Sequence, residues 1–418
     1  MALAVRFWFV RLYGPVVEGD AITYLRIGRL LATGRLDEYD GAAPPVYGAF
    51  LELLGESPTL VQAVQSLLGV AISLLVAWLV WRPTRSTALA VAAGLTHALA
   101  MDSLCFEAFL VAETLSTALL VGAMVLLTMA LERPRPAPWL VFGMSLVLSL
   151  GGLTKPLLLT LFPVAWAALV WRWRSERTGR AIVVTSLAGA LPIVVLVGGW
   201  SVYNGRTHGV WGPSTMTGYR MSQHVGSVMQ DAPDRYRVIR DIFVAHRDRS
   251  VAETGSATNT IWAAIPEMER ATGLPYGRLS LEVNEMSWAV AQRHPDVLVR
   301  SVASAWTGFW SRPMYYKPAH AHTVSARAAL MSVARAERPL GWALNLGLLL
   351  LAPLWLFLTR LRRKIPPAPA GLFLAVVLAG SIAQALAERS DNGRFAVPLL
   401  PLIVVTAVLA VWSMWNRA

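Results

Sequence analysis

The sequence predicts an all-α polytopic membrane protein with about ten transmembrane helices, interfacial helices and a small extracytoplasmic lobe. Composition is the first observation, since 55% of the 418 residues are hydrophobic, only 15% are charged, and the mean hydropathy is +0.50. A soluble domain carries about 25% charged residues. The second observation is a series of long apolar runs, and the third is a set of arginine clusters between alternate runs. Together they exclude a single soluble domain, a disordered chain and a disulfide scaffold.

Nine apolar runs, and a weaker one at the N-terminus, are expected to cross the membrane. The hydrocarbon core of a bilayer is about 30 Å thick, so a spanning helix needs about 20 apolar residues. The run of residues 1–17 is short and contains Arg6 and Arg11, which predicts a weak or truncated first span. The other expected spans are residues 59–81, 86–101, 109–131, 139–153, 157–171, 181–203, 340–358, 369–387 and 395–415.

The arginine clusters predict the orientation of the chain. Its 37 basic and 25 acidic residues give a net charge of +12, which can also indicate nucleic-acid binding. Short arginine-rich loops between spans instead follow the positive-inside rule, which places them in the cytoplasm. We therefore expect a multi-pass protein of the plasma (inner) membrane with cytoplasmic termini and no nucleic-acid partner. The clusters are Arg82, Arg85, Arg133, Arg135, Arg172, Arg174, Arg177, Arg180, Arg360, Arg362, Arg363, Lys364 and Arg417.

Two of the loops that are then extracytoplasmic are long enough to carry a function. The first covers residues 18–58, inside an N-terminal transmembrane region of residues 1–203. The second covers residues 204–339 and precedes a C-terminal transmembrane region of residues 340–418. Its polar residues 230–285 predict a small lobe. Residues 294–310 predict an amphipathic interfacial helix that turns three aromatic residues towards lipid, namely Trp306, Phe309 and Trp310.

The first outer loop contains a predicted amphipathic helix that starts at Asp20 and ends at Gly34. Asp20 allows two interpretations. Its carboxylate can cap the helix by accepting free backbone N–H groups, or it can act as a general base at the membrane surface. After the helix, the pair Pro44-Pro45 predicts extended chain. The apolar face of the helix is expected to consist of Ile22, Leu25 and Leu31.

Three further charged residues at the outer face are candidates for a site. Glu113 lies near the outer end of the span 109–131, where it can snorkel or face a partner in a cavity. Lys155 lies in a tight outer turn, where it can anchor headgroups or bind an anion. Arg394 enters the last span and can snorkel or hold a phosphate in a two-point grip. Two other acids, Asp102 and Glu107, are expected to be solvated.

Metal and nucleotide chemistry are not indicated by the residues. The seven histidines show no zinc spacing with carboxylates or with the single cysteine, Cys105. The sequence contains neither a Walker-type phosphate loop nor a dinucleotide fingerprint. No cofactor is expected, and a divalent metal stays an open alternative.

Seven short segments spread over residues 18–402 occur in an order typical of one family. In this order, and on one side of the membrane, they resemble the GT-C superfamily of integral membrane glycosyltransferases, in the protein O-mannosyltransferase and aminoarabinose transferase branch. The chain departs from the mannosyltransferases in having Ala21 after Asp20 instead of a glutamate, and in its short first span. The segments are Gly19-Asp20-Ala21 with Tyr24, Pro44-Pro45-Val46-Tyr47, Glu113, Leu153-Thr154-Lys155-Pro156, Asn204 to Gly218, His294-Pro295, and Asn392-Gly393-Arg394-Phe395 with Pro398.

The resemblance implies that the chain moves a sugar, a hexose or a pentose, from a polyprenyl phosphate to an acceptor. The acceptor would be a hydroxyl of a lipid, glycan or protein at the extracytoplasmic face, and the anomeric carbon would be inverted. Asp20 would be the catalytic base. The partners would be the lipid-linked donor, the acceptor and membrane lipids. The donor phosphate would be bound by Lys155, Arg220 and Arg394, and other parts of the substrates by Tyr24, Tyr47 and Glu113.

Two other functions fit a polytopic chain. A transporter or flippase predicts an internal two-fold repeat and helices broken at the membrane midplane. The sequence shows no convincing repeat, and its ionisable residues gather at one face. A non-catalytic assembly subunit would keep the fold without the chemistry, and an activity assay separates it from an enzyme.

Overall fold

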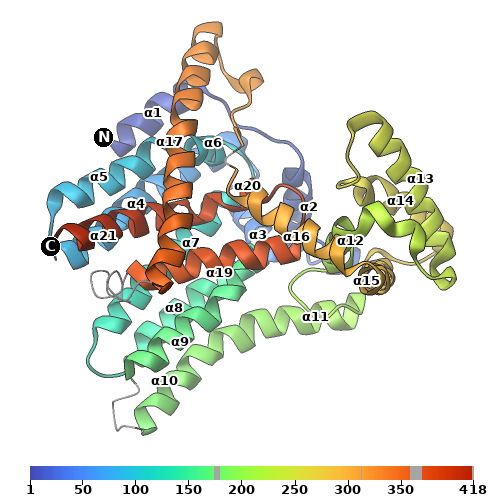
Figure 1. The fold of residues 1–418 in the computed structure, drawn as a ribbon, viewed down its shortest axis with the longest axis horizontal. Coiled ribbons are helices and arrows are strands. Elements are labelled where there is room, and N and C mark those ends of the chain that lie inside the picture. The colour runs from blue at the N-terminus through green and yellow to red at the C-terminus, as the bar shows by residue number, and fades with distance from the viewer. Residues whose placement is uncertain (174–178, 312, 358–369, 417–418) are drawn as a thin grey trace.

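The computed structural model describes residues 1–173, 179–311, 313–357 and 370–416. These residues form helices joined by short loops (Figure 1), with two isolated β-bridges and no strand of more than one residue. Five helical stretches are long and apolar enough to cross a membrane, and the pair α5 (Thr87–Leu99) and α6 (Met101–Ala108), bent by 49°, can form a sixth. The five stretches are Pro58–Thr84, Glu113–Glu132, Pro156–Trp173, Gly179–His208 and Asn392–Trp415.

The expectation of about ten spans is not confirmed. Helices α8 (Pro138–Gly152) and α19 (Leu372–Ala387) are apolar but shorter than a full span. Helix α1 (Ala2–Leu12) has 11 residues, a length of about 16 Å, which is half of the hydrocarbon thickness. Helix α17 (Val324–Phe357) lies against α21 (Leu400–Asn416) and runs through the predicted domain boundary at residues 339–340. The expected span 340–358 ends outside the described residues, and the span 369–387 begins outside them.

The core of the helical bundle lies between α4 (Pro58–Thr84), α7 (Glu113–Glu132), α8, α9 (Leu161–Trp173), α19 and α21. Small residues bring helices close, as in membrane proteins generally. A Cβ on Gly94 of α5 would lie 2.9 Å from the backbone oxygen of Ser73 in α4. The surface of the bundle that faces away from the core is apolar too, which suits contact with hydrocarbon. Helix α10 (Gly179–Pro192) and the π-helical turn η3 (Ile193–Gly198) expose Val183, Val184, Leu187, Leu191, Val194 and Val195.

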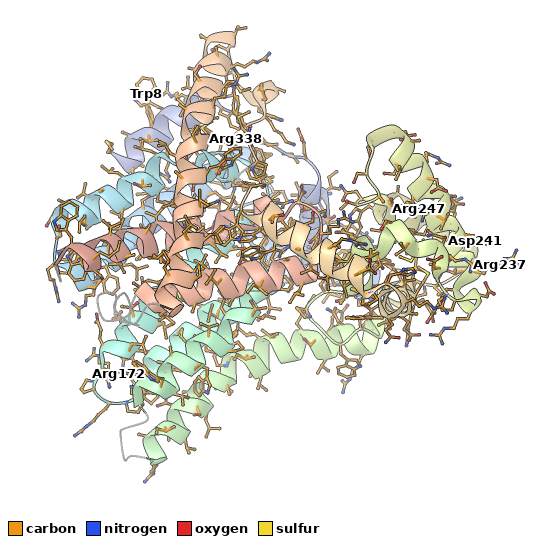
Figure 2. All side chains as sticks on the ribbon, in the orientation of Figure 1. Trp8, Arg172, Arg237, Asp241, Arg247 and Arg338 are labelled. Atoms are coloured by element: carbon orange, nitrogen blue, oxygen red, sulfur yellow. The ribbon has the colours of Figure 1, made fainter. Side chains whose placement is uncertain are left out.

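Ion pairs and hydrogen bonds identify the two ends of the bundle. At one end Arg82 of α4 pairs with Glu132 of α7 at 3.0 Å, and Arg172 of α9 donates to the backbone oxygen of Leu131 at 3.0 Å. Figure 2 shows Arg172 far from the labelled lobe residues. At the other end, which we call the site end, Glu113 at the start of α7 meets Lys155, which follows α8. Arg82 and Arg172, two of the arginines predicted to be cytoplasmic, therefore lie at the end opposite to the site end. Seven other predicted positions, Arg174, Arg177, Arg360, Arg362, Arg363, Lys364 and Arg417, lie outside the described residues.

Residues 18–58, predicted to be the first outer loop, contain two packed helices, α2 (Asp20–Thr33) and α3 (Pro45–Leu53). The predicted bounds of α2 are confirmed, since Gly34 ends it with a left-handed φ of 70°. The extended chain expected at the proline pair is wrong beyond Pro44, because Pro45 begins α3, where a missing N–H costs nothing. The helices touch at two glycines. A Cβ on Gly28 would lie 2.6 Å from the backbone oxygen of Gly48.

Helix α3 also corrects the predicted apolar face of α2. Ile22, expected on that face, is 68% exposed, while Leu25 and Leu31 are only partly buried. The buried face instead contains Ala21, Tyr24, Ile27, Gly28 and Leu30. The reason is that α3, absent from the prediction, covers the side of α2 on which the two glycines allow close approach.

Residues 217–293 form a helical lobe at one side of the molecule (Figure 1). Its helices are α12 (Thr217–Val225), α13 (Arg237–Thr254), α14 (Thr260–Thr272) and α15 (Tyr276–Arg293). They share a core of their own that includes Tyr219, Phe243, Ile261, Val283 and Met286. The predicted boundary at residues 203–204 falls inside α11 (Gly199–His208), which leads from the bundle towards the lobe.

Helix α16 (Pro295–Phe309) returns the chain to the bundle where the sequence predicted an amphipathic helix. The prediction that its aromatic residues face lipid is wrong. Phe309 is fully buried and Trp310 is 6% exposed, both within the core of the bundle. Trp306 donates its indole N–H to the Ser381 hydroxyl of α19 at 3.0 Å. The aromatic face is covered because α16 packs on α19 and on α20 (Asn392–Phe395).

A buried histidine on α12 predicts how the lobe responds to pH. Burial lowers the pKa of His224 to about 4, and the charge of Arg389 contributes to the shift. Unfolding restores an ordinary pKa of about 6.5, so stability is lost as the pH falls from about 6.5 towards 4. At pH 5 the loss is about 2 kcal/mol. We expect smaller amide protection factors, which are corrected for the intrinsic pH dependence of exchange, in α12 and α16 at pH 5 than at pH 7. The difference should be smaller in His224→Gln, and an equal difference in both chains would contradict the assignment to His224.

Candidate functional site

Asp20 is held in place by the turn that precedes α2. Gly19, with a φ of 57°, occupies the N-cap position, and Asp20 is the first helical residue. Glu18 accepts hydrogen bonds from Lys317 and from His320, at 3.0 Å for the histidine, which ties this turn to the chain after α16. The hydrogen bond from Lys317, and then that from His320, lowers the pKa of Glu18. The start of α2 is therefore anchored without the help of Asp20.

The capping interpretation of Asp20 is wrong, because no side chain makes a capping hydrogen bond at the start of α2. The Asp20 carboxylate instead accepts a hydrogen bond from Nη1 of Arg394, 374 residues away, at 2.8 Å. The side chain of Asp20 is 55% exposed and that of Arg394 is 17% exposed. Asp20 thus forms an ion pair while remaining more than half exposed.

Glu113, the first residue of α7, lies beneath this pair. Its side chain is fully buried, and Oε1 accepts hydrogen bonds from Nζ of Lys155 at 2.8 Å and from Nε of Arg394. The start of a helix also favours a negative charge. We call Asp20, Glu113, Lys155 and Arg394 the ionic quartet. Its two carboxylates and two cations balance, with Glu113 and Lys155 buried and Asp20 outermost.

Arg394 is positioned by the one-turn helix α20. Asp391, with a φ of 49°, begins the turn, and the side-chain amide of Asn392 donates to the backbone oxygens of Glu388 and Arg389 at 3.0 and 2.7 Å. A Cβ on Gly393 would lie 2.4 Å from Cδ of Pro313, so only glycine fits. These contacts fix the direction in which the guanidinium leaves the backbone.

Lys155 is the least accessible cation of the quartet. Its side chain is 7% exposed, and Nζ lies 4.2 Å from the centroid of the Phe395 ring, a cation–π contact. Burial lowers the pKa of Lys155, and the charge of Glu113 opposes this shift. Lys155 therefore neutralises the charge of Glu113 in the buried part of the site. Arg394 is left as the more accessible cation of the quartet.

Tyr24 and Tyr47 lie beside the quartet on α2 and α3. Their rings are in contact, with centroids 4.8 Å apart. Burial raises the pKa of Tyr24; Asp20 and Glu113 raise it further, whereas Arg394 and Arg220 lower it, so its hydroxyl stays protonated between these charges. Tyr47 is fully buried and donates to Oε1 of Gln65 at 3.1 Å. Tyr47 thus supports the wall of the site, and a contact of Tyr24 or Tyr47 with substrate stays a prediction.

Arg220 is not part of the quartet. It lies on α12 with its Nε 3.5 Å from Oε2 of Glu388, and its side chain is 28% exposed. Binding of the donor phosphate by Arg220 stays a prediction. Sequence reasoning missed Glu388, although its place in the last outer turn, six residues before Arg394, was a usable signal. It also missed Gln65, whose amide donates to the backbone oxygens of Glu107 and Phe109 ahead of α7.

A second buried ion pair lies away from the quartet. Arg6 of α1 donates to Oε1 of Glu107 at 2.7 Å, and both side chains are at most 3% exposed. The expectation that Glu107 is solvated is therefore wrong, because Arg6 supplies its counter-charge from inside the bundle. Within the residues that the structure describes, no group of three histidine, cysteine or acidic side chains could hold a metal ion.

Comparison with known proteins gives a loose structural likeness. No protein-family model and no curated protein matches the sequence. The structure resembles ArnT from Cupriavidus metallidurans in the apo state, with a TM-score of 0.35 and 14% identity over 99% of this chain and 76% of that chain. It also resembles ArnT bound to undecaprenyl phosphate, with a TM-score of 0.36, 15% identity and the same coverage. Likeness at these values assigns neither a family nor an activity to this chain.

Proposed function

We propose that this chain is a membrane glycosyltransferase of the GT-C type. It moves a sugar from a polyprenyl phosphate to a hydroxyl group of a lipid, glycan or protein at the extracytoplasmic face. The observation that carries the proposal is the pair formed by Asp20 and Arg394 above a buried carboxylate and lysine, at one end of an apolar bundle. A base and a phosphate-binding cation are the two groups that this transfer requires at one place.

In the proposed reaction an acceptor hydroxyl oxygen attacks the anomeric carbon while the bond from that carbon to the phosphate oxygen breaks. The electron pair of the broken bond stays on the phosphate, and the hydroxyl proton moves to the carboxylate of Asp20. The phosphate gains one negative charge as Asp20 loses one, so the net charge of the site is unchanged. A single displacement of this kind inverts the anomeric carbon.

Arg394 connects the two halves of this reaction. Its Nε faces buried Glu113, whereas its Nη1 faces Asp20, which is more than half exposed. A donor phosphate that arrives from the outer side competes with Asp20 for the guanidinium, which can hold a phosphate by two parallel hydrogen bonds. Binding of the donor then releases the Asp20 carboxylate, so that the base becomes free when the substrate is in place.

A reconstituted system tests this proposal against a flippase. Vesicles that contain the purified chain are loaded with undecaprenyl phosphate carrying a radiolabelled hexose or pentose, together with a mixed lipid and glycan acceptor extract. A glycosyltransferase releases undecaprenyl phosphate and transfers the label to a new product. Movement of the intact labelled lipid between leaflets, with no cleavage of the bond to phosphate, would show a flippase and overturn the proposal.

Cysteine labelling tests the proposed orientation of the site. Ala252 on the lobe and Arg135 between α7 and α8 are both exposed, whereas the native Cys105 is buried. We expect a membrane-impermeant thiol reagent to label Ala252→Cys in intact cells and Arg135→Cys only after permeabilisation. The reverse pattern would place the quartet on the cytoplasmic face and contradict transfer outside the cell.

A further inference from the structure

A polar cluster lies between the lobe and the ionic quartet. It contains Arg220 and Gln223 on α12, Glu388 at the end of α19, and Asn392 at the start of α20. Gln223, Asn392 and Glu388 are buried, at 1%, 4% and 7% exposure. Asn392 and Arg394 belong to the same helical turn, so the cluster and the quartet share the element α20.

Hydrogen bonds hold this cluster in a fixed shape. Oε1 of Gln223 accepts from the backbone N–H groups of Arg389 and Ser390 at 3.2 and 3.1 Å. The hydroxyl of Ser390 donates to Oε1 of Glu388 at 2.9 Å. The amide of Asn392 donates to the two backbone oxygens at the start of the same turn. The turn 388–392 is therefore fastened to α12, and the side chains are pre-positioned.

Each of the four side chains nevertheless keeps one buried polar atom that is unsatisfied by the residues the structure describes. These atoms are Nε of Arg220, Nε2 of Gln223, Oε2 of Glu388 and Oδ1 of Asn392. The Arg220 and Glu388 atoms are 3.5 Å apart and pair by charge without forming a hydrogen bond. Nε2 of Gln223 and Oδ1 of Asn392 therefore have no partner at all among the described residues. Buried polar groups are rarely left in this way, which indicates a polar ligand at this turn.

The mixture of atoms identifies the class of ligand. Of the two unpartnered atoms, Nε2 of Gln223 is a donor and Oδ1 of Asn392 is an acceptor, and the ion pair beside them adds one donor and one acceptor. A phosphate offers acceptors only, and an ammonium group offers donors only. Hydroxyl groups both donate and accept, and a sugar ring carries several of them at fixed spacing. We propose that Arg220, Gln223, Glu388 and Asn392 form a subsite for sugar hydroxyls beside the phosphate-binding Arg394, an inference that rests on the proposed function.

Two variants test the subsite while leaving the quartet unchanged. Glu388→Gln keeps the acceptor for Ser390 and replaces the carboxylate oxygen that faces Arg220 by an amide donor. Gln223→Glu keeps the acceptor for the backbone N–H groups of Arg389 and Ser390 and replaces the unpartnered donor Nε2 by an oxygen. The measurement is equilibrium binding of sugar-free undecaprenyl phosphate and of undecaprenyl phosphate carrying glucose, mannose, galactose, arabinose or aminoarabinose. Glu253→Gln, at an exposed position of α13, is the matched control.

We expect the wild-type chain to bind one sugar-carrying lipid more tightly than the sugar-free lipid. We expect Glu388→Gln to lower that preference about 10-fold or more, the effect of one charge-assisted hydrogen bond, with binding of the sugar-free lipid unchanged. A wild-type chain with no preference, variants that keep it, or variants that weaken both lipids equally would overturn the subsite. A wild-type chain that binds neither kind of lipid would overturn the proposed function itself.

Discussion

Asp20→Asn is expected to lower the rate of sugar transfer at least ~100-fold, in line with the usual contribution of a general base. The same change is expected to tighten the binding of sugar-free undecaprenyl phosphate by about 2- to 5-fold. Asp20 and the phosphate compete for Arg394, and a pair with one exposed partner is worth roughly 0.2–1 kcal/mol. Single-turnover transfer and equilibrium lipid binding, measured on the same preparation, check the two effects.

The opposite signs of these effects separate a base from a structural residue. A residue needed only for the fold would weaken both transfer and binding when it is replaced. Asp37→Asn is the matched control, since Asp37 is exposed in the same outer loop, and it should change neither measurement. Transfer that persists in Asp20→Asn would remove Asp20 from the mechanism, and weaker lipid binding would refute the competition for Arg394.

Arg394→Ala is expected to lower kcat/KM for the lipid-linked donor by about 100-fold or more, and Arg394→Lys by about 10- to 100-fold. Arg394 donates hydrogen bonds to Glu113 through Nε and to Asp20 through Nη1, two nitrogens of one planar guanidinium. Lysine has a single nitrogen and cannot hold a phosphate by two parallel bonds. Each charge-assisted hydrogen bond that is lost contributes roughly 1.5–3 kcal/mol. The transfer rate as a function of donor concentration provides the measurement.

Arg389 offers the control for this series, since it lies in the same outer turn, five residues before Arg394. Arg389→Lys should match the wild type, because the Arg389 contacts described above use its backbone. A snorkelling arginine needs only a positive charge on a long stem. Equal curves for wild type and Arg394→Lys would therefore show that Arg394 anchors the chain at the interface and does not grip phosphate.

The sequence predicted the helices better than it predicted what covers them. Apolar runs located α4, α7, α10 and α21, because a membrane span needs about 20 consecutive apolar residues and such a run is visible in the sequence. The helix α16 was predicted from its amphipathic period, but the period does not say which partner covers the aromatic face, and Trp306 faces α19 instead of lipid. Helix α3 was missed because Pro45 was interpreted as a break, although proline is favoured in a first turn.

The members of the ionic quartet were singled out one by one in the sequence, but the contacts between them were not predicted. Asp20, Glu113, Lys155 and Arg394 were each singled out as charges at the outer face. Nothing local indicates that Arg394 joins Asp20 to Glu113, since these pairs are 374 and 281 residues apart in the chain. For the same reason Glu107 was expected in water, although Arg6 pairs with it from 101 residues away. Long-range ion pairs depend on the packing of helices, which single-sequence patterns do not specify.

The position of the donor phosphate tests the central claim most directly. A cryo-EM structure of Asp20→Asn in lipid nanodiscs with undecaprenyl phosphate would locate it without turnover. We predict phosphate oxygens within hydrogen-bonding distance of the Arg394 guanidinium, on the side that Asp20 occupies in the present structure, with Glu113 still bound to Lys155. A phosphate bound elsewhere, with the guanidinium still directed at residue 20, would contradict a reaction centre built on Asp20 and Arg394.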